Sequence, residues 1–390
     1  KAGSQEIKSK VVPTFRFDQR LLEKIDEVFF DEQVANIEKE YNFDMSFLKT
    51  ELYPYQTEGI RFATFKRSAI LADEMGLGKT LQAIATACLK KEVFGIERVL
   101  IVCPASLKRQ WKQEIEKFTD YKALLLEGSP AWRRHTIIRD KTFFKIMNYE
   151  MILRDIDAIK QQPPDLVILD EAQRIKNFAT KTHQAIKQIP RSHSLVLTGT
   201  PLENKLEDLY SIVQFCNPET LSPLWAFAAQ HYRLSRERGN KILGYHNLEL
   251  VQEKIKPLLL RRSKAEVFDS LPDITRSRIV LEPTEHQMRH HQGYLQSLQG
   301  IIRKKILTPI DIQRMQMLLL RMRMVCDASC LVDDTCKNTS SPKLEELESL
   351  LRDVVVEGNR KVIIFSEWTS MTALVGAVVS KLGLDFVEFT

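Results

Sequence analysis

The alternation of apolar and polar positions divides the chain into regions of different character. From Leu52 to about Phe215, short apolar runs alternate with stretches whose apolar residues recur at helical spacing. The apolar runs predict strands at Ala69–Ala72, Val99–Cys103, Ala123–Leu126, Phe143–Met147, Leu166–Leu169 and Leu195–Thr198. Helices are predicted between most of them, at Thr80–Lys91, Leu107–Phe118, Tyr149–Lys160 and Lys181–Gln188. Strands this apolar, separated by helices, are typical of a parallel sheet covered on both faces.

Three further segments surround this α/β lobe, which we expect at residues 51–216. Residues 1–50 have apolar positions at helical spacing and predict an N-terminal helical extension. Residues 217–276 predict a mainly helical insertion or linker. From residue 277 we expect a second α/β domain with a helical insertion, incomplete at residue 390. Its expected strands are Arg278–Leu281, Val362–Phe365 and Phe386–Phe389, and its expected helices are Glu285–Cys326, Pro342–Glu357 and Ser370–Leu382.

Composition adds only weak constraints. A formal net charge of +6 permits a polyanionic partner, although many metabolic enzymes are equally basic. Six cysteines are too few for a disulfide scaffold in a chain of 390 residues. Three of them cluster without C-x-x-C spacing or a nearby histidine, which favours reduced thiols over a zinc site: Cys326, Cys330 and Cys336. No apolar run approaches the roughly 18 residues that a membrane span needs.

The first candidate for chemistry is the segment Ala69-Ile-Leu-Ala-Asp-Glu-Met-Gly-Leu-Gly-Lys-Thr80, in which a strand runs through a glycine-containing turn into a helix. Backbone N–H groups of such a turn, with the positive end of the helix, cradle phosphates. Lys79 can contact the β- and γ-phosphates, and the Thr80 hydroxyl can ligate Mg²⁺. A strict phosphate-binding loop has glycine where this chain has Asp73, and a chance Gly-Lys-Thr at a helix start is the alternative. The predicted nucleotide-binding residues are Asp73, Glu74, Met75, Gly76, Leu77, Gly78, Lys79 and Thr80.

The second candidate is Leu166-Val-Ile-Leu-Asp-Glu-Ala-Gln173, where two carboxylates follow an apolar strand. The ligand crevice of a parallel sheet lies at such strand ends. Asp170 can hold Mg²⁺ through its water shell, and Glu171 can orient and deprotonate an attacking water. Adjacent acids at a strand end are common in loops, but both motifs in this order favour a nucleotide hydrolase. We therefore expect Lys79, Asp170 and Glu171 to be catalytic, with Thr80 and Asp170 near the metal.

These motifs resemble those of the Swi/Snf group of superfamily-two helicases. Asp170-Glu-Ala-Gln173 resembles the D-E-x-H box, and its continuation Arg174-Ile-Lys-Asn177 is similar to the Swi/Snf group, which also has aspartate at the position of Asp73. The resemblance runs from Leu52 to the end through further segments: Leu52–Gly59, Val102–Ser106 with Trp111, Asn148–Glu150, Leu197–Asn204, Leu259–Arg262 with Leu271–Pro272, and Val362–Trp368. It implies a P-loop NTPase of α/β class. Two RecA-like lobes, each a parallel β-sheet flanked by helices, would carry helical insertions, and the second lobe would be incomplete.

The resemblance also implies roles for single residues. Gln56 would hydrogen-bond the edge of adenine. A coupling group would relay the state of the phosphate site to the DNA-facing side: Gln173, Thr198, Gly199 and Thr200. A second group would grip the phosphate backbone of duplex DNA without reading its sequence: Ser106, Lys108, Asn148 and Lys176. Glutamine at Gln173 is typical of several prokaryotic members, which predicts a cytoplasmic, nucleoid-associated protein, with the nucleus as the alternative.

The function implied is ATP- and Mg²⁺-dependent translocation of a monomer along double-stranded DNA, with displacement of DNA-bound proteins. Family members also carry an arginine pair that would lie beyond Thr390. Because such arginines are worth ~10³–10⁵ in rate, we expect weak hydrolysis by these 390 residues. A strand-separating DNA or RNA helicase is one alternative, disfavoured by Arg174–Asn177 together with Leu259–Arg262. A non-catalytic binding scaffold is another, disfavoured by the intact phosphate-binding and acidic motifs.

Overall fold

The computed structural model describes residues 19–41, 43–175, 180–199, 206–235, 242–268, 276–304, 306–333 and 341–389. The chain divides into two compact units, Lys1–Pro272 and Asp273–Thr390. Within the described ranges, each helix is too short or too polar to cross a lipid bilayer.

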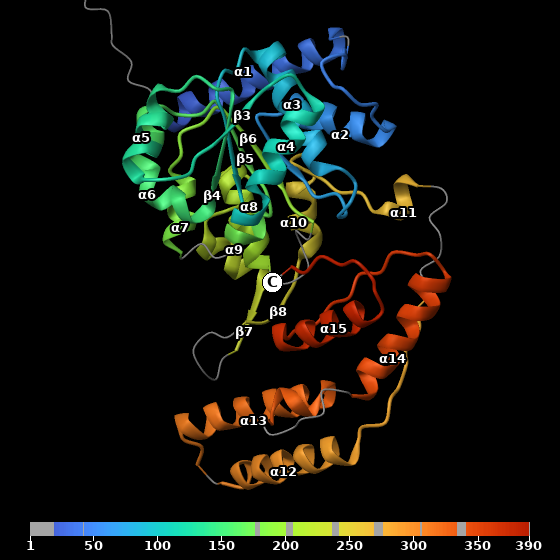
Figure 1. The fold of residues 1–390 in the computed structure, drawn as a ribbon. Helices are drawn as coiled ribbons and strands as arrows, with labels where there is room; N and C mark the ends of the chain where they lie inside the picture. Colours follow the sequence, from blue (N-terminus) through green and yellow to red (C-terminus); the bar gives the residue numbers. More distant parts are fainter. Residues whose placement is uncertain are drawn as a thin grey trace, which may run out of the picture. The chain divides into compact units, whose positions relative to one another are not determined.

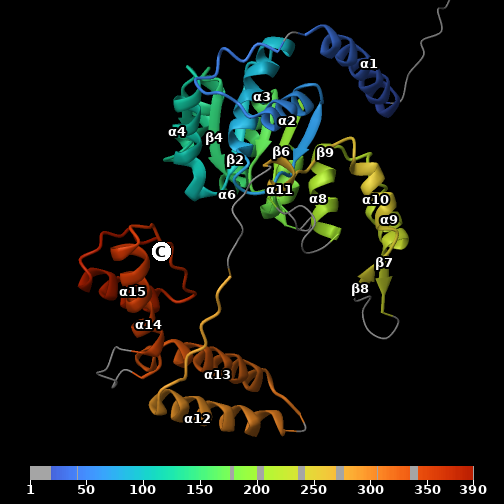
Figure 2. The same ribbon diagram turned by 90° about the vertical axis from the view of Figure 1, so that its right-hand side faces the viewer.

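A parallel sheet forms the centre of the first unit (Figures 1 and 2). Its seven described strands follow the order β3-β4-β2-β5-β6-β1-β9, and all neighbours pair in parallel. The strands are β1 (Ser68–Leu71), β2 (Val99–Cys103), β3 (Ala123–Leu125), β4 (Phe144–Asn148), β5 (Leu166–Leu169), β6 (His193–Leu197) and β9 (Leu259–Leu260). The six strands expected from the apolar runs are thus confirmed, with ends that shift by at most two residues.

Helices cover both faces of this sheet because successive strand residues point to opposite sides. Ala69 and Leu71 of β1 belong to a core that includes residues of α2, α3 and α4, whereas Ile70 belongs to a core that includes residues of α5 to α10. This explains why the strands read as continuous apolar runs. The helices of the unit are α1 (Gln19–Glu40), α2 (Pro54–Thr64), α3 (Lys79–Phe94), α4 (Lys108–Phe118), α5 (Pro130–Arg139), α6 (Tyr149–Gln161), α7 (Lys181–Lys187), α8 (Leu206–Cys216), α9 (Leu224–His231), α10 (Leu248–Ile255) and α11 (Lys264–Val267), with short 3₁₀ turns η1 (Ala105–Leu107) and η2 (Ala172–Ile175).

The prediction of a mainly helical segment at residues 217–276 needs correction. Besides three helices, it contains an antiparallel hairpin of β7 (Tyr232–Leu234) and β8 (Ile242–Tyr245). It also contains β9, in which Leu259 and Leu260 pair with Ile70 and Leu71 of the main sheet. A two-residue strand has no recognisable period, and only its distant partner β1 makes it a strand.

The second unit contains α12 (Glu285–Ile302), α13 (Pro309–Asp327), η3 (Ser329–Leu331), α14 (Pro342–Leu351), the π-helical turn η4 (Arg352–Glu357) and α15 (Thr369–Lys381). The long helix expected at Glu285–Cys326 is divided into α12 and α13, which lie side by side (Figures 1 and 2). Thr308 caps the second helix, and Pro309 occupies its first turn, where proline is favoured.

The strands expected at Arg278–Leu281, Val362–Phe365 and Phe386–Phe389 were predicted wrongly, since none of these described segments forms a strand. A strand needs a hydrogen-bonded neighbour, and the described residues of this unit provide none. Phe365 and Phe389 are correspondingly 89% and 92% exposed. Apolar side chains at these positions favour a strand only where neighbouring strands are present to pair with the segment.

A buried histidine in the first unit predicts a measurable pH dependence of stability. His193 on β6 packs against Phe30 and Phe94, with ring centroids 5.8 and 5.3 Å away. Neither ring nitrogen has a hydrogen-bond partner among the described residues. Burial, aided by Lys90 and Arg67, lowers the pKa of His193 from 6.5 to about 2. The native protein therefore keeps this imidazole neutral over the whole range in which an unfolded chain would protonate it.

We expect acid to destabilise the native protein through His193, and His193→Phe to remove this effect. Folding lowers the pKa of His193, so below pH 6.5 the unfolded state binds more protons than the native state. The free energy of unfolding therefore falls as the pH decreases from 6.5 toward 2. Between pH 7.5 and 5.5 this costs about 1.4 kcal/mol. Urea unfolding at both pH values measures it. His135→Phe, at an exposed site on α5, is the control and should leave the pH dependence unchanged.

Candidate functional site

The register of the sheet brings three strand ends together. β6 lies between β5 and β1, with Leu197 opposite Leu71 and Val196 opposite Leu169. The segments that follow these strands therefore leave the same edge of the sheet, where ligands of parallel sheets bind. They carry the glycine loop, Asp170 and Thr198, which the sequence alone predicted as separate motifs.

The loop between β1 and α3 has the form of an anion cradle. Gly76 and Gly78 have φ angles of 89° and 74°, a left-handed conformation that favours glycine. A Cβ atom on Gly78 would lie 2.5 Å from Nε2 of Gln56, so this position also lacks room for a side chain. No side chain caps the start of α3 at Lys79. Its first-turn N–H groups, which have no partner within the helix, can therefore bind an anion.

Lys79 folds back onto the loop that precedes it. Its Nζ atom donates hydrogen bonds to the carbonyl oxygens of Asp73, at 2.7 Å, and Glu74, at 3.3 Å. Burial lowers the pKa of Lys79, while the nearby carboxylates of Glu171 and Asp170 act to raise it. The ammonium group thus interacts electrostatically with both acids of the second motif. Thr80, the next residue of α3, is half-buried.

Asp73, the residue that replaces the expected glycine, lies beneath the loop. Its side chain is fully buried and accepts hydrogen bonds from Nε and Nη2 of Arg262, at 3.1 and 2.7 Å, and from Nε2 of Gln82 at 3.1 Å. The carboxylate is therefore engaged by the protein, and Asp73 can contribute to phosphate binding only through its backbone. The contribution of Asp73 to nucleotide binding stays a prediction.

Arg262 is the main structural residue of the site that sequence reasoning did not identify. It follows β9 as Asp73 follows β1, and parallel pairing of these strands brings the two side chains together. The same guanidinium donates to the carbonyl oxygen of Tyr55 and to Oε2 of Glu58, both on α2. An aspartate at a buried loop position requires a counter-charge, so Asp73 itself indicates that a cationic partner exists. The sequence does not show which arginine is that partner.

Lys264 is a second residue that the structure adds to the loop. Its backbone N–H donates to Oε2 of Glu74 at 2.7 Å. Its Cε and Nζ atoms lie 3.3 and 3.4 Å from the position that a Cβ atom of Gly76 would occupy. The loop therefore has a second lysine side chain beside it, contributed from 185 residues farther along the chain than Lys79, at the first position of α11.

The acidic motif is held by side chains of α4 and α6 and by its own backbone. Nε1 of Trp111 on α4 donates to Oδ2 of Asp170 at 2.8 Å, and the N–H of Glu171 donates to Oδ1 at 2.9 Å. The hydroxyl of Tyr149 donates to the carbonyl oxygen of Asp170 at 2.7 Å. Burial raises the pKa of Asp170, and the bond from Trp111 opposes this rise. Glu171 has a φ angle of 52°, a strained backbone conformation that is typical of functional sites.

Gln173 connects the acidic motif with the end of β6. Its Nε2 atom donates to Oε2 of Glu171 at 2.5 Å, and its Oε1 atom accepts from the Thr198 hydroxyl at 3.5 Å. Gly199 follows Thr198 and lies near Lys79, whose Nζ would be 3.9 Å from a Cβ atom there. Residues that follow all three strands therefore lie close together. Thr200, the last member of the expected coupling group, lies outside the described residues.

The side chain of Gln56 forms hydrogen bonds within the protein. Its Oε1 atom accepts from the N–H of Tyr53 at 3.1 Å, and its Nε2 atom donates to the carbonyl oxygen of Leu77 at 3.4 Å. The side chain thus ties the start of α2 to the glycine loop. Its expected contact with adenine stays a prediction.

The expected DNA-contacting residues differ in their surroundings. Ser106 is exposed on η1, directly after β2. Asn148 ends β4 opposite Cys103 of β2, so it lies at the same sheet edge, and its buried Oδ1 atom has no hydrogen-bond partner in the described part of the chain. Lys108 is mostly buried and forms an ion pair with Glu127 at 2.7 Å, so a DNA phosphate would have to compete with that carboxylate. Lys176 lies outside the described residues.

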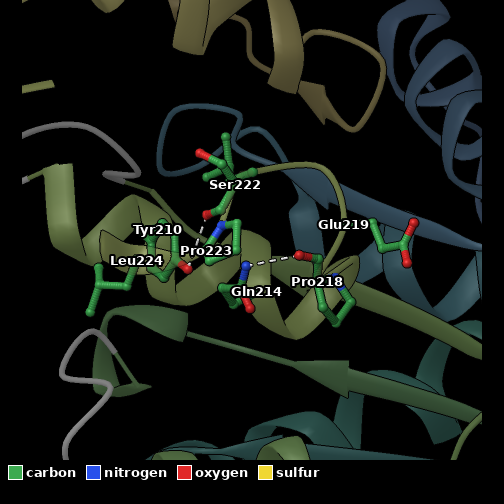
Figure 3. A pocket seen from close by; sticks show the side chains of 8 residues that line it. Tyr210, Gln214, Pro218, Glu219, Ser222, Pro223 and Leu224 are labelled. Carbon is green, nitrogen blue, oxygen red and sulfur yellow. Dashed lines mark hydrogen bonds between the residues drawn. The ribbon is translucent and has the colours of Figure 1, made fainter. Parts of the chain in front are cut away.

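A pocket of about 530 Å³ at the end of α8 contains none of the predicted site residues (Figure 3). Two of its side chains are used internally: Gln214 donates to the carbonyl oxygen of Pro218 at 3.0 Å, and Tyr210 donates to that of Ser222 at 3.3 Å. The chemistry-bearing residues therefore lie in the glycine loop and at the strand ends rather than in this pocket.

Comparison with known proteins agrees with this arrangement. A family model described as the SNF2-related domain matches residues 46–330. The chain is 29% identical over 370 residues to a protein of Mycoplasma pneumoniae described as an uncharacterized ATP-dependent helicase, covering 91% of this chain and 34% of that protein. It is 28% identical over 347 residues to the ISWI chromatin-remodeling complex ATPase ISW2 of Saccharomyces cerevisiae, covering 84% and 30%. The chain thus spans about a third of the length of these curated relatives.

Among solved structures, the SWI2/SNF2 ATPase core of Sulfolobus solfataricus in complex with double-stranded DNA is similar, with a TM-score of 0.52 and 26% identity. The alignment covers 86% of this chain and 71% of that one. The core domain of the same organism without DNA in its description gives a TM-score of 0.53 at 27% identity, with 87% and 70% covered. These similarities are to RecA-like α/β cores and agree with the sheet of the first unit.

Proposed function

Because the chain belongs to the family of SNF2-related domains, we propose that it couples ATP hydrolysis to movement along double-stranded DNA and to displacement of proteins bound there. The observation that carries the proposal is the hydrogen-bonded series from Glu171 through Gln173 to Thr198, at the same edge of the sheet as the loop that carries Lys79. A binding scaffold has no need for a strained acid that interacts electrostatically with a half-buried lysine. A motor needs both, together with a link from the site to another part of the sheet.

The groups of this site fit a nucleotide with its magnesium ion. The left-handed glycines and the uncapped start of α3 suit phosphate oxygens, and Lys79 adds a cation beside them. Mg²⁺, when bound, would neutralise charge that develops on the phosphates. Asp170 and Thr80 are the residues that would hold it. Glu171 would accept the proton of the attacking water.

Gln173 is proposed as the coupling residue. Its amide can donate and accept at once, and here it donates to Glu171 while accepting from Thr198. A change in the position of Glu171 would therefore be transmitted to the segment after β6. Trp111 offers a second route, because it joins Asp170 to α4, directly after the turn that carries Ser106.

Double-stranded DNA is proposed as the track on three grounds. The Sulfolobus core that resembles this chain is described as a complex with double-stranded DNA. Ser106 and Asn148 lie at the same edge of the sheet as the phosphate loop. They follow β2 and β4, which lie on the other side of β5 from β6 and β1. Hydroxyl and amide groups of this kind contact phosphates and position a protein without reading sequence.

The proposal is tested by ATP turnover with equal nucleotide concentrations of duplex DNA, single-stranded DNA and RNA. We expect duplex DNA to stimulate most, and the stimulation to weaken with rising salt as phosphate contacts are screened. Lys79→Ala, which removes the phosphate-binding cation, provides the background rate. Strongest stimulation by RNA or by single strands would contradict a duplex track and would favour a strand-separating helicase.

A further inference from the structure

Two histidines and a carboxylate converge in the second unit, on a surface that the proposed function does not use. His286 and His290 lie one turn apart on α12, with ring centroids separated by 4.7 Å. Asp333 follows η3, and its Oδ2 atom lies 3.8 Å from Nε2 of His286 and 3.5 Å from Nε2 of His290. The histidines precede Asp333 by more than 40 residues, so no spacing motif in the sequence predicts the group.

The separations suit shared coordination of one small cation. All three ligand atoms lie within 4.8 Å of one another. Two atoms bound at about 2.1 Å to a tetrahedral ion lie roughly 3.4 Å apart, close to the separations of Asp333 from both imidazoles. The Nδ1 atom of His286 is enclosed by protein without a hydrogen-bond partner among the described residues. Nε2 is thus the nitrogen of this ring that a metal would reach.

The surrounding contacts hold the three residues in place by other means. Gln287, between the histidines, caps α12 through Thr284 and donates from Nε2 to the carbonyl oxygen of Val325 on α13 at 2.9 Å. This bond sets the rotation of α12 against α13. The N–H of Asp333 donates to the carbonyl oxygen of Ser329 at 3.2 Å, which fixes the turn that carries the carboxylate. The ligands are therefore arranged before any ion binds.

We propose that His286, His290 and Asp333 bind a divalent transition-metal ion of the Zn²⁺ class. Two imidazoles and one carboxylate are ligands of the type that Zn²⁺ uses, whereas Mg²⁺ and Ca²⁺ prefer oxygen throughout. Three protein ligands leave a coordination position for water or for a group from a partner. The side chains are 44%, 30% and 19% exposed, so solvent reaches the site. A bound ion would join the first two turns of α12 to the segment after α13.

The competing explanation is an ion pair in which protonated histidine neutralises Asp333 without a metal. The two explanations predict opposite effects of pH. An ion pair strengthens as histidine protonates on acidification, whereas metal binding requires neutral imidazole and weakens under the same conditions. An ion pair alone would give no stoichiometric binding of a divalent ion at either pH, so binding of one ion per chain that is tighter at pH 7.5 than at pH 6 separates the two explanations.

The test uses the chain without a polyhistidine tag, stripped with chelator and free of nucleotide. Zn²⁺ titration by calorimetry and Co²⁺ titration by visible absorption should each show one ion per chain, with tighter binding at pH 7.5 than at pH 6. His290→Gln should weaken binding at least about 100-fold, because even indirect contacts to a metal are worth about 10–100-fold. Asp333→Asn should weaken it in the same direction. His291→Gln, at the neighbouring position of α12, is the matched control and should bind as the unaltered chain does.

Three outcomes would overturn the proposal. One is Zn²⁺ binding that His290→Gln leaves unchanged. A second is equal weakening by His291→Gln. The third is a thiolate-to-Co²⁺ charge-transfer band, which would assign the ion to cysteines such as the exposed Cys326. Since binding is measured without ATP or DNA, none of these outcomes depends on whether the proposed motor activity is correct.

Discussion

Glu171→Gln is expected to leave ATP bound while nearly abolishing its turnover. The substitution keeps the size of the side chain and removes its capacity to accept a proton. General-base catalysis contributes about 10²–10⁴ in rate, so turnover with duplex DNA should fall by a factor in that range. Affinity should change little, because phosphate binding rests on the glycine loop and Lys79. The hydrogen bond from Gln173 to this residue also limits how far the new side chain can move.

A fluorescent ATP analogue measures binding, and release of inorganic phosphate measures turnover. Glu97→Gln makes the same chemical change at an exposed position just before β2, at the opposite edge of the sheet, and should alter neither quantity. Unchanged turnover in Glu171→Gln would exclude Glu171 as the base. Loss of ATP affinity would instead assign Glu171 a role in binding.

Arg262→Met is expected to cause a large loss of stability in the first unit. It leaves the buried carboxylate of Asp73 without its cation, and breaking a buried pair in this way costs about 3–5 kcal/mol. The change also releases β9 and the start of α2 from the glycine loop, because Arg262 contacts Tyr55 and Glu58 as well. We therefore expect ATP affinity to fall together with the free energy of unfolding.

Urea unfolding of the first unit measures this effect, and a double-mutant cycle identifies its origin. Asp73→Asn combined with Arg262→Met should be less destabilised than the two single losses added together, since no uncompensated charge remains. Arg61→Met removes an arginine of α2 that pairs with Glu38 in solvent, and it should cost no more than about 1 kcal/mol. Additive losses in the cycle would show that the Asp73–Arg262 contact contributes little.

The first unit was more predictable than the second for a physical reason. Its strands are buried on both faces and therefore appear as continuous apolar runs, which led to six correct strands. The run at Val362–Phe365 is similarly apolar, but the described residues of its unit form no strand beside it, so the same rule failed there. An apolar composition shows that a segment could be buried in a sheet. It does not show whether neighbouring strands are present.

The chemistry of the site shows the same division. Residue types and local order were sufficient to identify the glycine loop, Lys79 and the adjacent acids, because a phosphate cradle is built within one short segment. Contacts between distant segments required the folded chain. The pairing of β9 with β1 decided that Arg262 neutralises Asp73, and the packing of α12 against α13 decided that two histidines face Asp333. Such contacts arise from strand register and helix rotation, which depend on residues far apart in the sequence.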